Sequence, residues 1–338
     1  MPYLVRAAVV IPTWNARSLL AEALASIEAQ TVPVEIVVVD NASTDGTAEM
    51  LATRFPRVTV VRNPDNIGFG RAINRGAQEA AGADVIVLVN NDAVCEPEFV
   101  ERLLEPFADR RIGMVAGVLL QGSAPGLIDS AGIELDTTLR SWDMLWNRPL
   151  EELAQAAEPV GPCGGAAAYR TDAFVELGGF DERFFAYWED VDLALRFRLA
   201  GWGCARAPGA RALHRHGATL GAASSAQRRL EAYGRAYVLA KYRVARSGLL
   251  MRLKIAVLDW PVLVVHLLLR REAGPLRARA AGRRDGLVAT PLRAPLELTT
   301  VGFREAAGRQ AAFLRLRLGG ALPEHFRDHA PPADGTPS

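Results

Sequence analysis

The sequence has few cysteines, and their spacing excludes the sites that cysteine usually builds. Cys95, Cys163 and Cys204 are the only three in 338 residues, and they lie far apart. An odd, widely spaced set forms neither a zinc-type pair nor a disulfide framework. The first residues run into an apolar strand pattern and show no signal-peptide layout. We therefore expect a protein of the reducing cytosol.

The sequence also lacks an apolar run long enough to predict a membrane span. Residues 255–269 are strongly apolar, but Asp259, Pro261 and His266 interrupt them, and a span needs about 20 mostly apolar residues. The net charge is only +1, yet residues 250–317 hold 13 Lys/Arg against 5 Asp/Glu, a net charge of +8. An acidic body with a basic tail indicates an anionic partner for the tail.

Strand and helix patterns alternate over the first 120 residues. Short apolar runs predict strands at residues 7–11, 35–39, 58–61, 84–89 and 113–120. Between them, Ala48, Leu51, Ala52 and Phe55 have helical spacing after a turn-like segment. This alternation predicts an α/β fold with a mostly parallel sheet, whose ligands bind outside the carboxyl ends of the strands.

The residues after 120 complete the first domain and add a helical region and a tail. Residues 121–159 are weakly patterned and predict loops over the site, and a helix at 188–200 precedes a strand that ends at His214. After residue 224 the pattern becomes helical and basic. The expected domains are residues 1–223, a helical region at 224–325 and a disordered tail at 326–338.

Polar residues end three of the predicted strands. They are Pro12 to Asn15 after the first strand, Asp40 to Thr47 after the second, and Asn90, Asn91 and Asp92 after the fourth. Parallel neighbours would bring all three clusters to one edge. Asp40 suits the ring N–H of a uracil, thymine or guanine, and Asp92 suits Mg²⁺ or Mn²⁺ on a diphosphate. Any one cluster alone is better explained as turn-forming residues, whereas three clusters on the predicted binding edge favour a ligand site.

The segment at 66–74 follows the third strand and opens a helix. Its glycines, Gly68 and Gly70, would let backbone N–H groups approach a phosphate. Arg71 would add a positive charge there, or it is an ordinary solvated arginine. The spacing lacks the third glycine of a dinucleotide-binding motif.

Two acids fall in the first turn of the helix predicted at 188–200. The helical face that indicates this consists of Val191, Ala194, Leu195 and Leu199. The helix dipole would keep Glu189 and Asp190 ionised, as a general base requires, although helix capping is a common role for such acids. Four aromatics come before them, of which we expect at least two in the core: Phe184, Phe185, Tyr187 and Trp188. Farther along, His214 could complete a metal site with Asp92, or be structural.

With these motifs in this order, the chain resembles family 2 glycosyltransferases of the GT-A fold, especially the bacterial rhamnosyltransferase-like branch. The resemblance covers residues 5–220 and rests on the strand-end clusters, the segment at 66–70, the run from Gly178 to Leu193, and His214. It implies that Asp190 is the general base, with Glu189 beside it, and that Asp92 and His214 bind Mg²⁺ or Mn²⁺. Asn90 and Asn91 depart from the family's acidic triplet and leave Asp92 as its one charged ligand.

The resemblance also implies where the substrates bind. We expect the acceptor beside Trp188, Gly164 and Gly165. The residues expected around the nucleotide-sugar are Pro12, Thr13, Asn15, Asp40, Asn41, Ser43, Asn66, Gly68, Arg71 and Asn91.

The expected reaction is an inverting transfer of L-rhamnose from dTDP-L-rhamnose, or of a sugar from a UDP donor, to a hydroxyl of a cell-envelope or lipid-linked glycan. The alternatives are a sugar nucleotidyltransferase and a non-catalytic relic that binds nucleotide or glycan. We expect no nucleic-acid partner. The basic region would hold the protein at the anionic inner face of the cell membrane, or would instead be a soluble appendage that forms a homodimer.

Overall fold

The computed structural model describes residues 5–215, 224–269 and 271–318 of the chain. These residues form two compact units. The first consists of Met1–Glu134 and Asp143–Thr219, and the second of Leu135–Trp142 and Leu220–Ser338. The predicted division at residues 223 and 224 stays a prediction, and the predicted tail at 326–338 lies outside the described residues.

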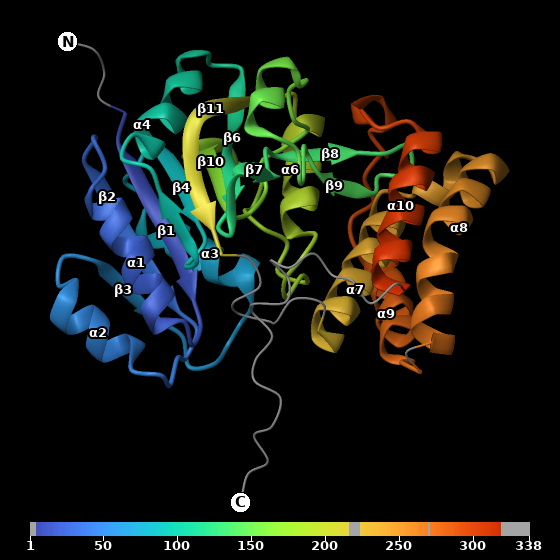
Figure 1. Ribbon diagram of the computed structural model, residues 1–338, viewed down its shortest axis with the longest axis horizontal. Coiled ribbons are helices and arrows are strands. Elements are labelled where there is room, and N and C mark those ends of the chain that lie inside the picture. Colours follow the sequence, from blue (N-terminus) through green and yellow to red (C-terminus); the bar gives the residue numbers. More distant parts are fainter. Residues whose placement is uncertain (1–4, 216–223, 270, 319–338) are drawn as a thin grey trace, which may run out of the picture. The chain divides into compact units, whose positions relative to one another are not determined.

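The first unit is built on a nine-stranded mixed sheet (Figure 1). Its strands are β1 (Ala7–Thr13), β2 (Val34–Asp40), β3 (Thr59–Arg62), β4 (Val85–Val89), β5 (Ala93–Cys95), β6 (Ile112–Gln121), β7 (Ala124–Ser130), β10 (Ala166–Arg170) and β11 (Gly203–His214). Their order is β3-β2-β1-β4-β10-β6-β11-β5, with β7 paired to β6. The pairs β3–β2, β2–β1, β1–β4 and β6–β11 are parallel, and β10 is antiparallel to both neighbours. The predicted α/β fold is confirmed.

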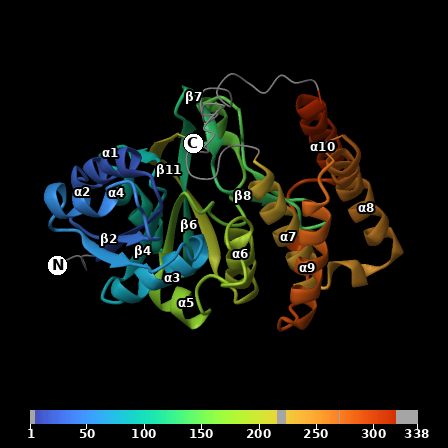
Figure 2. The ribbon, with the colours of Figure 1, turned by 90° about the horizontal axis from the view of Figure 1, so that it is seen from below.

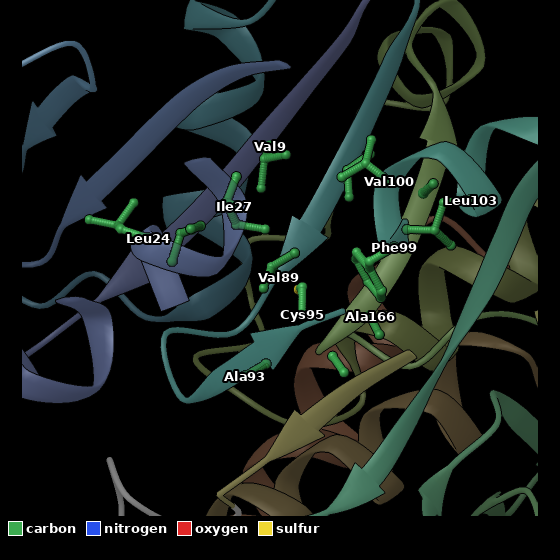
Figure 3. Close-up of a cluster of buried hydrophobic side chains, with 14 of the residues drawn as sticks. Val9, Leu24, Ile27, Val89, Ala93, Cys95, Phe99, Val100, Leu103 and Ala166 are labelled. Carbon is green, nitrogen blue, oxygen red and sulfur yellow. The ribbon is translucent and has the colours of Figure 1, made fainter. Parts of the chain in front are cut away.

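Helices cover both faces of this sheet (Figure 2). They are α1 (Arg17–Glu28), α2 (Thr47–Arg54), α3 (Phe69–Glu79), α4 (Phe99–Leu104), α5 (Thr171–Glu176) and α6 (Glu189–Leu199), with the short 3-10 turn η1 (Glu105–Ala108) after α4. Side chains alternate between the faces of each strand. Val9 therefore packs with Leu24 and Ile27 of α1 (Figure 3), whereas Val10 packs on the side of α3. A Cβ added at Gly76 would collide with Val10, so this glycine lets α3 lie close to the sheet.

The segment at 121–159 is more ordered than the sequence indicated. It contains β7, β8 (Ile133–Leu135), β9 (Ser141–Asp143) and the 3-10 turn η2 (Leu150–Gln155). The strands β8 and β9 pair in a separate two-stranded sheet. The predicted loops therefore include short strands: β8 and β9 have only three residues each, and Pro125 and Gly126 weaken the strand pattern of β7.

The second unit is helical, as its pattern predicts. Its elements are α7 (Ser225–Lys241), η3 (Val244–Ser247), α8 (Leu249–Val264), the π-helical turn η4 (Val265–Leu269), α9 (Gly274–Val288), η5 (Leu296–Leu298) and α10 (Phe303–Leu318). Helices α7 and α9 pack closely at two glycines of α9. A Cβ added at Gly282 or Gly286 would collide with a backbone carbonyl of α7, so only glycine allows this approach. Among the residues that the structure describes, no helix combines the length and apolar character that crossing a bilayer requires.

Arginines surround one buried acid inside the second unit. The carboxylate of Asp259 is approached by Arg140 at 3.3 Å, by Arg235 at 3.4 Å, and by Arg279. Burial opposes ionisation of Asp259, but these cations outweigh it and lower the pKa of the carboxyl group. The ion cluster therefore ties α7, α8 and α9 to the segment Leu135–Trp142. It also explains why Asp259 interrupts the apolar run that begins at residue 255.

Candidate active site

The carboxyl ends of β1, β2 and β4 lie side by side, as predicted. Thr13 is opposite Asp40 in the parallel register, and Pro12 is opposite Val39. The side-chain amide of Asn91, just past β4, donates a 3.1 Å hydrogen bond to the hydroxyl of Thr13. The structure thus brings three strand ends together in one polar cluster.

The loop after β2 is held to the loop after β1 by reciprocal bonds. The backbone N–H of Asn15 donates to the Ser43 hydroxyl at 2.9 Å, and the N–H of Thr44 donates to the Asn15 side chain at 2.8 Å. Asn15 has a φ of 48°, a left-handed conformation that asparagine tolerates better than most residues. These bonds fix the rim of the cluster around Asp40.

Asp40 is fully buried and only half satisfied. Its Oδ1 accepts the Ser43 N–H at 2.9 Å. Its Oδ2 is buried without a hydrogen-bond donor, and the Arg62 guanidinium lies 3.7 Å away. A buried carboxylate oxygen that lacks a donor is costly, and an N–H of a bound base would satisfy it.

The glycine segment before α3 is linked to the same cluster. The Asn41 side chain donates to the carbonyl of Gly68 at 3.2 Å, and the N–H of Gly68 donates to Asn66 at 3.1 Å. Gly68 has a φ of 88°, and a Cβ there would collide with the carbonyl oxygen of Phe185. Only glycine fits this position.

Arg71 lies apart from that contact network. Its Nε donates to the carbonyl of Glu182 at 3.2 Å and lies 3.4 Å from the Glu182 carboxylate, with both side chains about half exposed. The structure thus shows Arg71 paired at the surface, and its predicted role at the phosphates stays a prediction.

His214, at the end of β11, lies between two carboxylates. Its Nε2 is 3.2 Å from Asp92 Oδ1, and its Nδ1 is 2.6 Å from Asp129 Oδ2. Asn90 Nδ2 is 3.4 Å from the same Nε2. Burial disfavours the charged imidazolium, but the two carboxylates outweigh it and raise the pKa of His214 to about 10. Asp92 and His214 thus lie in contact, and their predicted role as metal ligands stays a prediction.

Asp92 and His214 offer a carboxylate oxygen and an imidazole nitrogen, donor atoms that Mg²⁺ or Mn²⁺ can take together with substrate phosphates. Within the described part of the chain, no group of three or more His, Cys, Asp or Glu side chains is arranged to enclose a metal ion. Mg²⁺ is commonly bound by one or two protein ligands together with substrate phosphates. The 3.2 Å between Asp92 Oδ1 and His214 Nε2 is the length of their own ion pair, which a cation held by both residues would replace.

Asp129 is a site residue that the sequence did not reveal. It lies in β7, within the segment predicted to be loops, and is 85 residues from His214. Histidine ligands usually donate their second ring N–H to a carboxylate or carbonyl, which fixes the tautomer and the ring orientation. An acid in a short strand gives no such signal, so only the fold places Asp129 here.

The two acids at the start of α6 follow a strained turn. Tyr187 and Trp188 have φ values of 67° and 78°, which are unfavourable for aromatic residues. Such strain costs on the order of 1 kcal/mol or more per residue and is concentrated at functional sites. The turn leads directly into Glu189 and Asp190, which occupy the first turn as predicted.

Burial acts against the helix dipole at these acids. Burial raises the pKa of Asp190, although hydrogen bonds from the N–H groups of Gly164 and Val191 oppose the rise. Burial, followed by the nearby charge of Asp190, raises the pKa of Glu189. Oε2 of Glu189 is buried without a hydrogen-bond partner. Burial thus acts against the expected effect of the helix dipole, and the ionised state of the two acids stays a prediction.

Gly164 and Gly165 connect the strand-end cluster to α6. The N–H of Gly164 donates to Asp190 Oδ2 at 3.1 Å, and the carbonyl of Gly165 accepts from Asn90 at 3.3 Å. A Cβ at Gly165 would lie 3.0 Å from Asn90 Nδ2. These contacts bring Asp190 into the same constellation as Asn90.

One detail of the predicted packing before α6 was wrong. Of the four aromatics before the helix, only Phe184 is in the core; Phe185 is 39% exposed, and Tyr187 and Trp188 are half-buried. Leu199 is 38% exposed, because the last turn of α6 emerges from the core. Trp188 is thus accessible beside Glu189, as an acceptor-binding side chain requires.

Comparison with known proteins identifies a family. Residues 8–178 match the sequence profile described as "Glycosyl transferase family 2". The N-acetylglucosaminyl-diphospho-decaprenol L-rhamnosyltransferase of Mycobacterium tuberculosis is 32% identical over 232 residues, which cover 61% of this chain and 75% of that protein. The O-antigen chain rhamnosyltransferase WbaN of Salmonella anatum is 26% identical over 217 residues, covering 62% of this chain and 66% of that protein.

Solved structures support the fold. The mannosyltransferase PcManGT from Pyrobaculum calidifontis, in complex with GDP-Man and Mn²⁺, has a TM-score of 0.53 and 20% identity, covering 97% of this chain and 83% of that one. GalNAc-T7 with UDP, GalNAc and Mn²⁺ has a TM-score of 0.54 and 18% identity, covering 74% of this chain and 52% of that one. These similarities show the GT-A architecture of the first unit's sheet and helices.

Proposed function

The chain belongs to glycosyltransferase family 2, and on that premise we propose that it transfers L-rhamnose from dTDP-L-rhamnose to a hydroxyl of a lipid-linked glycan, with inversion at the anomeric carbon. A UDP-sugar is the second candidate donor. The observation that carries this proposal is a single polar cluster at the strand ends and the start of α6. It contains Asp40, Asp92, His214 and Asp190.

The relatives support the choice of sugar and acceptor. Two of them are rhamnosyltransferases, and the mycobacterial one acts on a sugar linked through a diphosphate to a polyprenol, as its name states. A thymine or uracil base carries one ring N–H, which matches the single buried Asp40 oxygen that lacks a donor. The proposed donor therefore suits both the family and the base site.

The proposed chemistry is a single displacement. The acceptor hydroxyl attacks the anomeric carbon while Asp190 takes its proton, and the bond from that carbon to the diphosphate oxygen breaks. Its raised pKa makes Asp190 a stronger base than an exposed aspartate. The strained turn at Tyr187 and Trp188 sets the position of its carboxylate, and the Gly164 N–H sets its orientation.

Asp92 and His214 are the residues that would hold a divalent cation. When bound, Mg²⁺ or Mn²⁺ supplies positive charge that stabilises the departing diphosphate. Asp129 fixes the imidazole so that Nε2 faces Asp92. The glycine segment around Gly68 would place its backbone near the donor, in the conformation that the Asn41 and Asn66 contacts impose.

The site of action that fits this acceptor is the inner face of the cell membrane, with the protein bound peripherally. The helical second unit would make that contact through its basic surface. A homodimer formed by this unit is the competing arrangement.

A direct assay tests the reaction class. The protein is incubated with dTDP-L-rhamnose or UDP-sugars, Mn²⁺, and an N-acetylglucosaminyl-diphospho-lipid acceptor, and the products are separated by chromatography. Release of the nucleoside diphosphate with a rhamnosylated lipid of inverted configuration supports the proposal. Pyrophosphate release would identify a nucleotidyltransferase, and no turnover with any donor would identify a binding relic.

A further inference from the structure

Helix α8 of the second unit carries an apolar face that the fold leaves exposed. The side chains of this face are between 45% and 72% exposed, and they are Leu249, Leu250, Leu253, Val257, Trp260 and Val264. At about 100° per residue they fall within an arc of about 100° of the helix. We call these six residues the exposed face of α8.

The opposite side of α8 already supplies its contacts with the unit. Met251, Leu258 and Leu263 are buried, and Leu258 packs in a cluster with Val301 and Ala306. A helix that packs on one side normally has polar residues on the other, whereas a helix that is apolar all round is buried or in contact with lipid. Folding of the second unit therefore does not explain the exposed face of α8.

Cations border this face. Arg252 is exposed on one flank, and Lys254 lies on the other, with its Nζ 5.6 Å from the centre of the Phe303 ring. Residues 224–318 contain 19 Lys/Arg and 6 Asp/Glu, a net charge of +13. Long basic side chains beside an apolar stripe can extend to phosphate groups while their methylenes remain on the apolar side.

A basic hollow lies beside the segment that precedes the same helix. It has a volume of about 590 Å³ and is open to solvent, and its basic lining residues are Arg243, Arg246 and Arg293. Glu297 is its one acid and pairs with Arg293 at 3.1 Å. Because η3 carries Arg246 and leads into α8, the hollow is continuous along the chain with the exposed face.

We infer that the exposed face of α8 lies in the interface of an anionic bilayer, with headgroup phosphates bound at the arginines of the hollow. Trp260 suits this position, since indole rings concentrate where apolar chains meet headgroups. A second copy of the chain would bring two segments of +13 together, each covering residues 224–318, which opposes dimerisation through this face, whereas an anionic surface attracts each basic residue by electrostatics.

This inference deepens the proposed function and rests on it only for the choice of a membrane-bound acceptor. Binding to vesicles is measured without donor, and donor turnover is measured without vesicles. Failure of the membrane surface and failure of the proposed reaction are therefore distinguishable.

The test is flotation of the full chain with vesicles of phosphatidylcholine alone and of phosphatidylcholine with phosphatidylglycerol. We expect binding to the anionic vesicles, at least about tenfold weaker in 0.5 M salt than in 0.1 M salt, and a blue shift of tryptophan emission that Trp260→Phe removes. Leu253→Glu and Val257→Glu should each weaken binding about tenfold or more, because each places a charge in the apolar layer.

The matched control is Val175→Glu, which adds the same charge at an apolar residue of α5 that is 62% exposed. It should bind anionic vesicles as the unaltered chain does, and all three glutamate variants should keep their thermal stability and donor hydrolysis. Vesicle binding unaffected by Leu253→Glu and Val257→Glu would overturn the inference. A second result would also overturn it. In that result the parent chain binds no vesicles and sediments as a dimer, and the two variants dissociate this dimer.

Discussion

Nδ1 of His214 and Oδ2 of Asp129 lie 2.6 Å apart, with both side chains largely buried. The carboxylate accepts the Nδ1–H, so Nε2 is directed towards Asp92, at 3.2 Å. Asp129 fixes the rotamer of the ring and keeps a proton on Nδ1. Because the raised pKa keeps His214 protonated in this arrangement, a cation would bind at Nε2 by displacing the proton there.

Asp129→Asn should weaken Mn²⁺ binding about 10–100-fold, the range usual for loss of a carboxylate behind a metal-binding histidine. The measurement is a titration of Mn²⁺, followed by electron paramagnetic resonance, in the presence of dTDP. Asp109→Asn, a carboxyl-to-amide change at an exposed ion pair with Arg111, serves as the control. Unchanged Mn²⁺ affinity in a folded Asp129→Asn variant would remove Asp129 from the site.

The strand-end part of the site follows from the sequence, because parallel strands that alternate with helices must align their carboxyl ends. The placement of Thr13 opposite Asp40 is a direct consequence of that pattern. By contrast, Asp129 is brought to His214 only by the pairing of β7 with β6 and of β6 with β11. Pairings between distant segments leave no local pattern, so this contact could not be predicted.

Two further features depend on burial and backbone conformation, which the pattern does not encode. The positive φ of Tyr187 and Trp188 is invisible in the sequence, since aromatic residues rarely adopt it. The helix position of Glu189 was predicted correctly, but its desolvation depends on the whole fold. Likewise, the composition of α8 indicated an apolar helix without indicating which side would remain exposed.

Asp92→Ala should remove activity together with metal dependence, because Asp92 is the one acid among the three residues after β4. Calorimetry of dTDP binding with and without Mn²⁺ measures this directly, and the variant should bind dTDP equally weakly in both conditions. Asn90→Ala keeps the carboxylate and is expected to retain a metal-dependent enhancement. Metal-enhanced binding that persists in Asp92→Ala would contradict the assignment.

Asp190→Asn should abolish transfer while leaving donor affinity nearly intact, since the amide keeps the shape of the side chain but cannot accept the proton. Loss of a general base typically costs about 10²–10⁴ in rate. Rates of rhamnosyl transfer and the Kd for the donor are measured on the same preparations. If Asp190→Asn retained normal turnover and Glu189→Gln lost it, the base would be Glu189.

The rate of transfer should drop as the solution is acidified. The drop should begin at a higher pH than it would if the base were an exposed aspartate. The reaction needs ionised Asp190, and burial raises the pKa of this group above its ordinary value, near 4 in unfolded chains. The acidic limb of the kcat profile should therefore lie clearly above pH 4. Circular dichroism over the same range separates this limb from unfolding, and a limb at or below pH 4 would show that the base is a solvated group.

Glu189→Gln should stabilise the protein at neutral and alkaline pH. Burial raises the pKa of Glu189 in the folded chain, with the nearby charge of Asp190 adding to the effect, whereas the unfolded value is about 4.3. Between the two values the folded state binds more protons than the unfolded state, so stability falls as pH rises through this window. Glutamine carries no charge and lacks that fall. We expect a gain of about 1 kcal/mol or more for the variant above the window, measured as a higher Tm that converges with the parent value as pH approaches 4.

The exposed Glu79→Gln is the control and should follow the parent curve at every pH. Parallel curves for Glu189→Gln and the parent would mean that Glu189 is solvated in the folded protein, and its place beside Asp190 would then need another explanation.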